Sequence, residues 1–175
     1  MFFDLVKKRR SIRSFTEEPI SEKDWETILS CGLRAPSAKN ARPVELIVVK
    51  EKKTLEELGS FKERNAHFIP EAAGAIVVVV NRQKAPATYE EDASIVCSYL
   101  ELAIADLGLG SCWVNAIGNN HADGRPAGEV LKEMFHVPEE YEAIAVIALG
   151  HPAKHPGERT NVDEAHRIHE ESFRG

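Results

Sequence analysis

Apolar residues along the chain follow two different periods, which predict an alternation of strands and helices. Apolar runs of four to seven residues predict four strands, over residues 44–49, 75–80, 111–114 and 143–149. Apolar residues spaced three and four apart predict helices over residues 3–8, 21–32, 54–61, 92–107 and 127–135. Residues 75–80 are apolar throughout, which predicts a central strand covered on both faces.

The stretch 92–107 is the longest predicted helix and is apolar on nearly every side. A helix of this kind is buried, either in the core of the subunit or at an interface between subunits. The order of the elements lacks the regular strand–helix alternation of a dinucleotide-binding fold and favours an α+β architecture, with helices flanking one sheet. The last 25 residues are polar, with a further helix predicted near residues 163–171, and we expect them to wrap over another surface such as a second subunit.

Composition narrows the class of protein. A length of 175 residues predicts a single domain spanning residues 1–175. The 22 Lys and Arg against 28 Asp and Glu give a net charge of −6, which argues against nucleic acid as the main partner. Three cysteines without a CxxC spacing argue against a disulfide framework and favour a reducing compartment. Because no apolar run is long enough to span a bilayer and no signal peptide is evident, we expect a cytoplasmic protein with no membrane partner.

One segment departs from the acidic average: residues 7–13 (Lys-Lys-Arg-Arg-Ser-Ile-Arg) carry five positive charges. Charges this dense need either water or a counter-anion. Three interpretations are open: a solvated helix end, a nucleic-acid or nuclear-localisation patch, and a site for a small phosphorylated ligand held by Arg and Ser. The loop at residues 34–43, with three cations, is either a helix-to-strand connection or a second wall of such a site.

No motif supplies an evident catalytic side chain. The run Gly108-Leu109-Gly110-Ser111 follows a helix and precedes a strand, the reverse of the dinucleotide fingerprint, so it is better explained as a helix end. His166 and His169 have no Cys or HExxH partner, and we expect no metal site. No GxSxG element is present, and no cysteine has the local signature of a nucleophile. Either the protein only binds a ligand, or a cofactor carries the chemistry.

Four segments together resemble the nitroreductase family of FMN-dependent enzymes, and they occur in the family's order. They are residues 9–15 (Arg-Arg-Ser-Ile-Arg-Ser-Phe), the loop 34–43 (Arg-Ala-Pro-Ser-Ala-Lys-Asn-Ala-Arg-Pro), the helix and turn 92–113, and the ending 141–152 with Leu-Gly-His-Pro. This resemblance covers nearly the whole chain. It implies a nitroreductase-like fold with a central, mainly antiparallel sheet and a long buried core helix. It also implies an obligate homodimer with two FMN sites at the interface and a C-terminal tail reaching over the partner subunit.

The resemblance also implies roles for single residues in FMN binding. The residues that match ligands of the FMN phosphate and ribityl chain are Arg9, Arg10 and Ser11. Arg13 matches the cation near the flavin pyrimidine, where it would stabilise negative charge on the reduced flavin. Arg159 resembles a late phosphate ligand on the C-terminal tail, although the Lys that often precedes it in the family is Gly157 here.

The remaining matches come from the loop and from the third predicted strand. The residues expected to reach the other subunit's flavin are Pro36, Ser37 and Ala38. Further polar contacts are expected from Arg34 and Asn40. The segment where a backbone N–H would meet flavin N5 is Val114, Asn115 and Ala116.

The activity implied by the resemblance is reduction by NADH or NADPH. The dinucleotide would reduce bound FMN and leave, and an acceptor such as a nitroaromatic or quinone would follow by a ping-pong mechanism. The family's Gln and Trp in the loop are Arg42 and Val44 here. These departures leave room for a non-catalytic FMN storage or sensor module. A specialised family chemistry, such as flavin fragmentation or reductive dehalogenation, is a further alternative.

Overall fold

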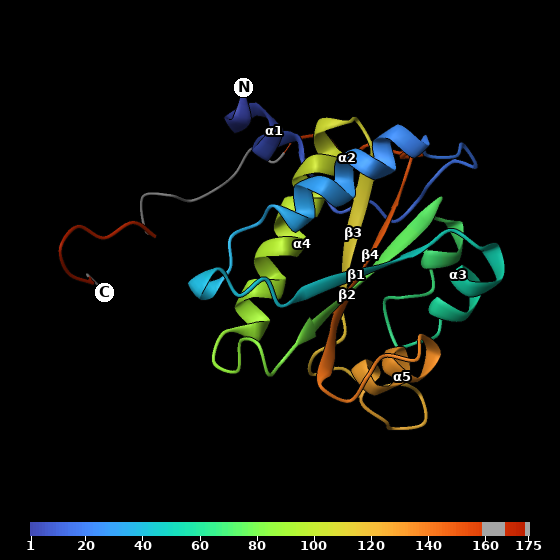
Figure 1. Ribbon diagram of the computed structural model, residues 1–175. Coiled ribbons are helices and arrows are strands. Elements are labelled where there is room, and N and C mark those ends of the chain that lie inside the picture. Colours follow the sequence, from blue (N-terminus) through green and yellow to red (C-terminus); the bar gives the residue numbers. More distant parts are fainter. Residues whose placement is uncertain (159–166, 174–175) are drawn as a thin grey trace.

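The computed structural model describes residues 1–158 and 167–173 and is built around one four-stranded sheet (Figure 1). The strands are β1 (Val44–Val49), β2 (Gly74–Asn81), β3 (Gly110–Asn115) and β4 (Tyr141–Gly150). Their order in the sheet is β1-β2-β4-β3, and all three pairings are antiparallel. The predicted α+β architecture with a mainly antiparallel sheet is therefore confirmed.

The central strand β2 is covered on both faces, as its uninterrupted apolar pattern predicted. All eight residues of β2 are buried. Ile76, Val78 and Val80 enter the hydrophobic cluster beneath α2 (Glu22–Leu33) and α4 (Tyr89–Asp106). Alternate β2 residues, such as Val77, enter a second cluster on the opposite face, where α3 (Lys52–Leu58) and α5 (Ala127–Met134) pack. Because side chains alternate along a strand, one apolar run supplies the cores of both layers.

Helix boundaries differ from the prediction in two places. α4 begins at Tyr89, three residues before the predicted start, because its polar first turn lies outside the apolar stripe. α3 spans Lys52–Leu58 rather than residues 54–61. It ends before Gly59, and Phe61 leaves the helix to become buried in the core. Elsewhere, Ser21 caps α2 as its position suggests, since its hydroxyl accepts a hydrogen bond from the Asp24 N–H.

The long helix α4 is buried on one side and exposed on another. Leu100 and Ile104 pack in the core, whereas the Tyr99 side chain is 41% exposed. Together with α1 (Phe2–Lys8) and the end of α2, the exposed side of α4 forms an apolar groove of about 660 Å³. Met1, Phe2 and Cys31 line the groove beside Tyr99. No helix in the described part of the chain combines the length and apolar character needed to cross a membrane.

The tail was predicted to turn helical near residues 163–171, and this is wrong for the part that the structure describes. Residues 167–171 form a turn and bends, while residues 163–166 lie outside the described residues. In Figure 1 the segment 167–173 lies apart from the body of the molecule. Ile168 and Phe173 are 68% and 84% exposed. A short segment without an apolar surface to pack against does not hold a helix in water.

Candidate functional site

The segment that follows α1 runs beside β3, and this placement sorts its side chains. The Ile12 N–H donates to the Ser111 carbonyl over 2.8 Å, and Ser11 forms a parallel bridge with Ser111. Ile12 is buried against Gly110, where any side chain would collide with it. Ser11 and Arg13, on either side of Ile12, are exposed. A strand-like alternation at residues 11–13 thus buries Ile12 and leaves the polar side chains of Ser11 and Arg13 at the surface.

Arg9 and Arg10 border a small basic pocket. Its volume is about 240 Å³, and Lys8, Ser111 and His155 also line it. The Arg9 guanidinium pairs with the Glu101 carboxylate of α4 over 3.4 Å. Arg10 donates to the Gly157 carbonyl over 2.7 Å. Cations and a hydroxyl around one cavity are the chemistry that a phosphate group requires.

Arg13 follows Ile12 in the chain and lies near Phe68 and near Lys62. Lys62 is a site residue that the sequence analysis did not identify. The Arg13 guanidinium stands 5.9 Å from the centre of the Phe68 ring. Lys62 is buried, and its Nζ donates to the Asn115 carbonyl over 2.9 Å and to Asn119 Oδ1 over 3.1 Å. Burial lowers the pKa of Lys62. Burial also raises the pKa of the Cys112 thiol, and the charges of Arg13 and Lys62 both oppose this effect, so the two cations share one neighbourhood.

The pairing of β3 decides which residue of the segment 114–116 could offer its backbone N–H to the flavin. β3 is an edge strand, paired only with β4 among the named strands. The Ala116 N–H is already bound to the Ile144 carbonyl over 2.9 Å. Because hydrogen bonds alternate along an antiparallel pair, the N–H and carbonyl of Asn115 face the free edge, where Lys62 takes the carbonyl. Of the predicted segment 114–116, Asn115 is therefore the residue with an N–H directed to the free edge.

The loop between α2 and β1 is held in a strained shape. Lys39, Asn40 and Arg42 have left-handed backbone, with φ of 52°, 54° and 46°. Asp92, only 2% exposed, accepts a hydrogen bond from the Ala38 N–H over 2.8 Å. The Ser37 hydroxyl accepts one from the Arg42 N–H over 2.9 Å. Conformations of this kind persist only where surrounding contacts enforce them, and they cluster at functional sites.

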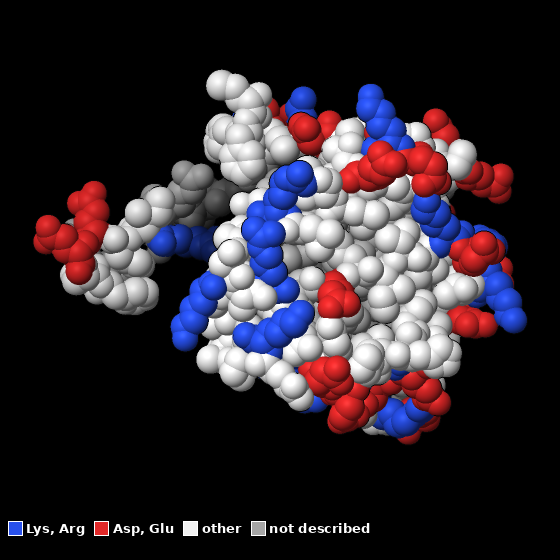
Figure 2. Space-filling model, in the orientation of Figure 1, with Lys and Arg blue, Asp and Glu red and all other residues white. Residues whose placement is uncertain are grey.

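The same loop is the most basic part of one face of the molecule. Arg34, Lys39 and Arg42 are all exposed. Arg34 folds back to donate to the Ser30 carbonyl over 3.0 Å. Figure 2 shows a band of Lys and Arg side chains on the left half of this face, over the end of α2 and the loop that follows. The loop therefore presents exposed cations on this face, with Pro36 exposed among them, and its role as a second wall of an anion site stays a prediction.

Within one chain, the structure does not bring the two halves of the predicted site together. The loop 34–43 is tied to Asp92, at the start of α4, whereas Arg9 is tied to Glu101. Nine residues of helix separate these two carboxylates, which corresponds to about 14 Å along the axis. Arg159, the predicted late phosphate ligand, lies outside the described residues.

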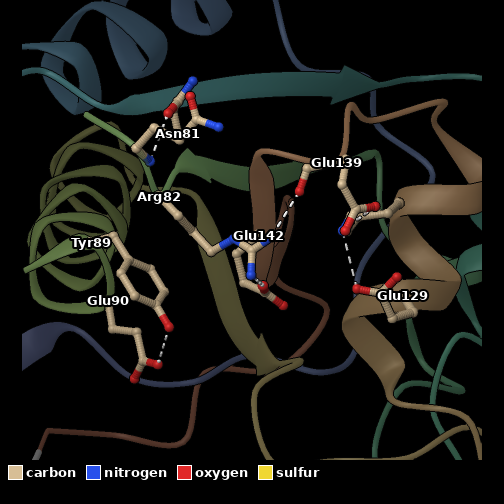
Figure 3. Close-up of polar contacts among 9 residues, drawn as sticks. Asn81, Arg82, Tyr89, Glu90, Glu129, Glu139 and Glu142 are labelled. Atoms are coloured by element: carbon tan, nitrogen blue, oxygen red, sulfur yellow. Dashed lines mark hydrogen bonds and ion pairs between the residues drawn. The ribbon is translucent and has the colours of Figure 1, made fainter. Parts of the chain in front are cut away.

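A second polar cluster lies where β2 ends and β4 begins, at the end of these strands away from the basic pocket (Figure 3). It includes none of the predicted site residues. Arg82 donates to the Glu139 carbonyl over 2.8 Å and pairs with Glu142 over 3.7 Å. The Tyr89 hydroxyl donates to Glu90 over 3.1 Å. Burial raises the pKa of the Glu142 carboxyl, although Arg82 opposes the shift. Within residues 1–158 and 167–173, no three His, Cys, Asp or Glu side chains converge as metal ligands.

Comparison with known proteins identifies the fold. The sequence profile of the Nitroreductase family matches residues 6–62 and 60–151. The chain belongs to the nitroreductase family. The chain is 31% identical to an FMN-dependent nitroreductase from Clostridium difficile, with a TM-score of 0.94 over 98% of this chain and 99% of that one. A candidate NADH dehydrogenase/NAD(P)H nitroreductase from Methanothermobacter thermautotrophicus is 33% identical over 172 residues, which is 97% of this chain and 86% of the relative. An NADPH-flavin oxidoreductase from Vibrio harveyi is 24% identical over 97% of this chain and 73% of its own length.

Proposed function

We propose that this nitroreductase-family protein is an FMN-dependent oxidoreductase that uses NADH or NADPH to reduce nitroaromatic, quinone or similar acceptors. The observation that carries the proposal is the free edge of β3. A basic pocket lies beside one end of this edge, and Arg13, Lys62 and the free Asn115 N–H lie toward the other. The names of the relatives support the same cofactor and electron donors.

The residues present fit FMN in charge and in hydrogen-bonding character. Arg9, Arg10 and Ser11 would hold the phosphate and the ribityl chain, because the pocket beside them is lined by cations and a hydroxyl. Arg13 would lie near the flavin ring and offset negative charge there. Asn115 would supply the backbone N–H that orients the ring. When bound, FMN supplies the capacity to accept and deliver a hydride.

At this edge the chain offers the Arg13 and Lys62 cations and the Asn115 N–H, so its task would be positioning and electrostatics. The dinucleotide and the acceptor would occupy the same place beside the flavin in turn. This arrangement predicts ping-pong kinetics, in which the oxidised dinucleotide leaves before the acceptor enters.

We further propose that the working form is a homodimer with two composite sites. The separation of the loop 34–43 from the segment 9–13 supports this, because a second copy can supply the missing half. The apolar groove lined by Phe2 and Tyr99 is a surface that a second copy would bury. The exposed apolar residues of the tail, Ile168 and Phe173, support an arm that reaches the partner.

A purified-protein experiment tests the proposal in three steps. Absorption near about 450 nm, or uptake of added FMN, tests the cofactor. Stopped-flow mixing with NADH or NADPH tests electron transfer by loss of this absorbance. Steady-state rates with nitroaromatics and quinones then test turnover. Protein that binds no FMN would refute the proposal, whereas bound FMN that neither dinucleotide reduces would favour a storage or sensor module.

We also expect a cytoplasmic protein, in accord with its three free cysteines.

A further inference from the structure

Glu101 is a carboxylate in a position that burial makes costly. It lies in the second half of α4, where Leu100 and Ile104 are completely buried, and its own side chain is only 13% exposed. Burial raises the pKa of the Glu101 carboxyl, although the Arg9 charge and the Ser111 hydroxyl oppose the shift. A buried carboxylate is costly unless a cation or hydrogen-bond donors compensate for its lost solvation.

The cation that compensates Glu101 is Arg9. Arg9 approaches from the segment after α1, at 3.4 Å, and the Ser111 hydroxyl of β3 donates over 3.4 Å. The other ionisable neighbours are two buried thiols, Cys97 on α4 and Cys112 on β3. Among the described residues, Arg9 is the only cation in ion-pair contact with Glu101. Glu101 thus partly neutralises the five-charge segment and fixes the direction of the Arg9 side chain.

We propose that Glu101 is a positioning residue that holds Arg9 in place and takes up a proton when a phosphate group binds in the adjoining basic pocket. This inference rests on the proposed FMN function, because it takes the phosphate of FMN as the anion. The pocket borders Arg9 and Ser111, so an anion there would share with Glu101 the guanidinium that now pairs with the carboxylate.

The physical reason is repulsion between two anions on one guanidinium. An arginine has five N–H donors, so Arg9 can bind a phosphate and a carboxylate together. A second negative charge nearby disfavours the ionised form of a carboxyl group that is already poorly solvated. Protonation of Glu101 removes the repulsion and leaves an O–H group that can still hydrogen-bond. Binding of the phosphate and uptake of the proton are therefore linked.

The linkage has a definite sign. Phosphate binding raises the pKa of Glu101 further, so between the free and bound values FMN affinity falls as pH rises. The phosphate group acts in the opposite direction, because it becomes a dianion above about pH 6 and then binds cations better. His155 also lines the pocket, and it is present in both wild type and a Glu101 variant. A comparison of the two at one pH therefore isolates Glu101.

The test is to measure FMN affinity from pH 6 to 9 by quenching of flavin fluorescence, in wild type, Glu101→Gln and Glu142→Gln. The last variant is the matched control, because Glu142 is a second partly buried glutamate with a raised pKa, far along the sheet beside Arg82. We expect Glu101→Gln to bind FMN about tenfold more tightly than wild type at pH 8 and to lose the fall in affinity with pH. Glu142→Gln should behave as wild type does.

Calorimetry on the wild-type protein gives a second readout that needs no variant. Titration with FMN at pH 7.5 in buffers of different ionisation enthalpy should show net proton uptake, and riboflavin, which lacks the phosphate, should show none. Equal pH slopes in wild type and Glu101→Gln, or equal proton counts for FMN and riboflavin, would overturn the inference while leaving the proposed function intact. Failure of the wild type to bind FMN at any pH would refute the proposed function and this inference with it.

Discussion

Asp92 is the buried carboxylate that ties the loop 34–43 to α4, and substitution of Asp92 by Ala should loosen the loop. Asp92 accepts hydrogen bonds from the Ala38 N–H and the Thr88 hydroxyl. Hydrogen bonds to a charged group contribute about 1.5–3 kcal/mol each. The left-handed backbone of Lys39 and Arg42 costs about 1–3 kcal/mol at each residue. Only the bond to Ala38 reaches the loop, and its contribution is similar in size to the strain at one of these residues, so loss of the carboxylate should loosen the loop.

We expect Asp92→Ala to weaken FMN binding by at least about tenfold, since 1.4 kcal/mol of lost loop stability already gives that factor. Asp92→Asn should lose much less, because its amide oxygen can still accept the Ala38 N–H. Glu90→Ala, an exposed change in the same turn of α4, controls for effects on the helix. The assays are FMN titration and urea unfolding at pH 7. If Asp92→Ala binds FMN as tightly as wild type, the loop does not depend on Asp92 and the reasoning fails.

Five further substitutions have separate outcomes. Arg13→Ala should slow flavin reduction by NAD(P)H in stopped flow by about tenfold or more while changing FMN affinity little, and Arg9→Ala should do the reverse. Lys62→Met should weaken FMN binding by about tenfold in equilibrium titration, because the Asn115 carbonyl loses its partner. Glu142→Gln should raise the urea midpoint at pH 7 and leave it unchanged near pH 4, because the raised carboxyl pKa makes wild-type stability fall as pH rises above the unfolded value. Tyr99→Glu should shift the protein toward monomer in sedimentation velocity, because it places a charge in the apolar groove.

The parts of the fold that depend on local periodicity were predictable from the sequence. The strand 44–49 was placed at its observed bounds, and residues 75–80 were correctly placed at the centre of the sheet. The predicted helix boundaries were wrong where a helix extends beyond its apolar residues. The start of α4 at Tyr89 carries acidic residues that complement the helix dipole but extend no apolar stripe.

The candidate site was predictable only as separate segments. The charge density of residues 7–13 and the composition of the loop 34–43 indicated anion binding, but their distance from each other along α4 depends on tertiary contacts. The role of Lys62 could not be predicted from the sequence, because its partners Asn115 and Asn119 lie more than fifty residues away. In addition, the acceptor on Asn115 is the backbone carbonyl, which every residue has. The choice of Asn115 within the segment 114–116 required the pairing of β3 with β4.

The free edge of β3 also bears on how the protein avoids aggregation through unpaired strand edges. An unpaired strand edge can recruit a strand from another molecule, and natural proteins guard such edges with charged side chains and short covering segments. Ser11 and Ile12 cover one end of β3, and the Lys62 ammonium takes the outward carbonyl of Asn115 at the other. The cations that make this edge attractive to an anionic cofactor therefore also make it a poor template for aggregation.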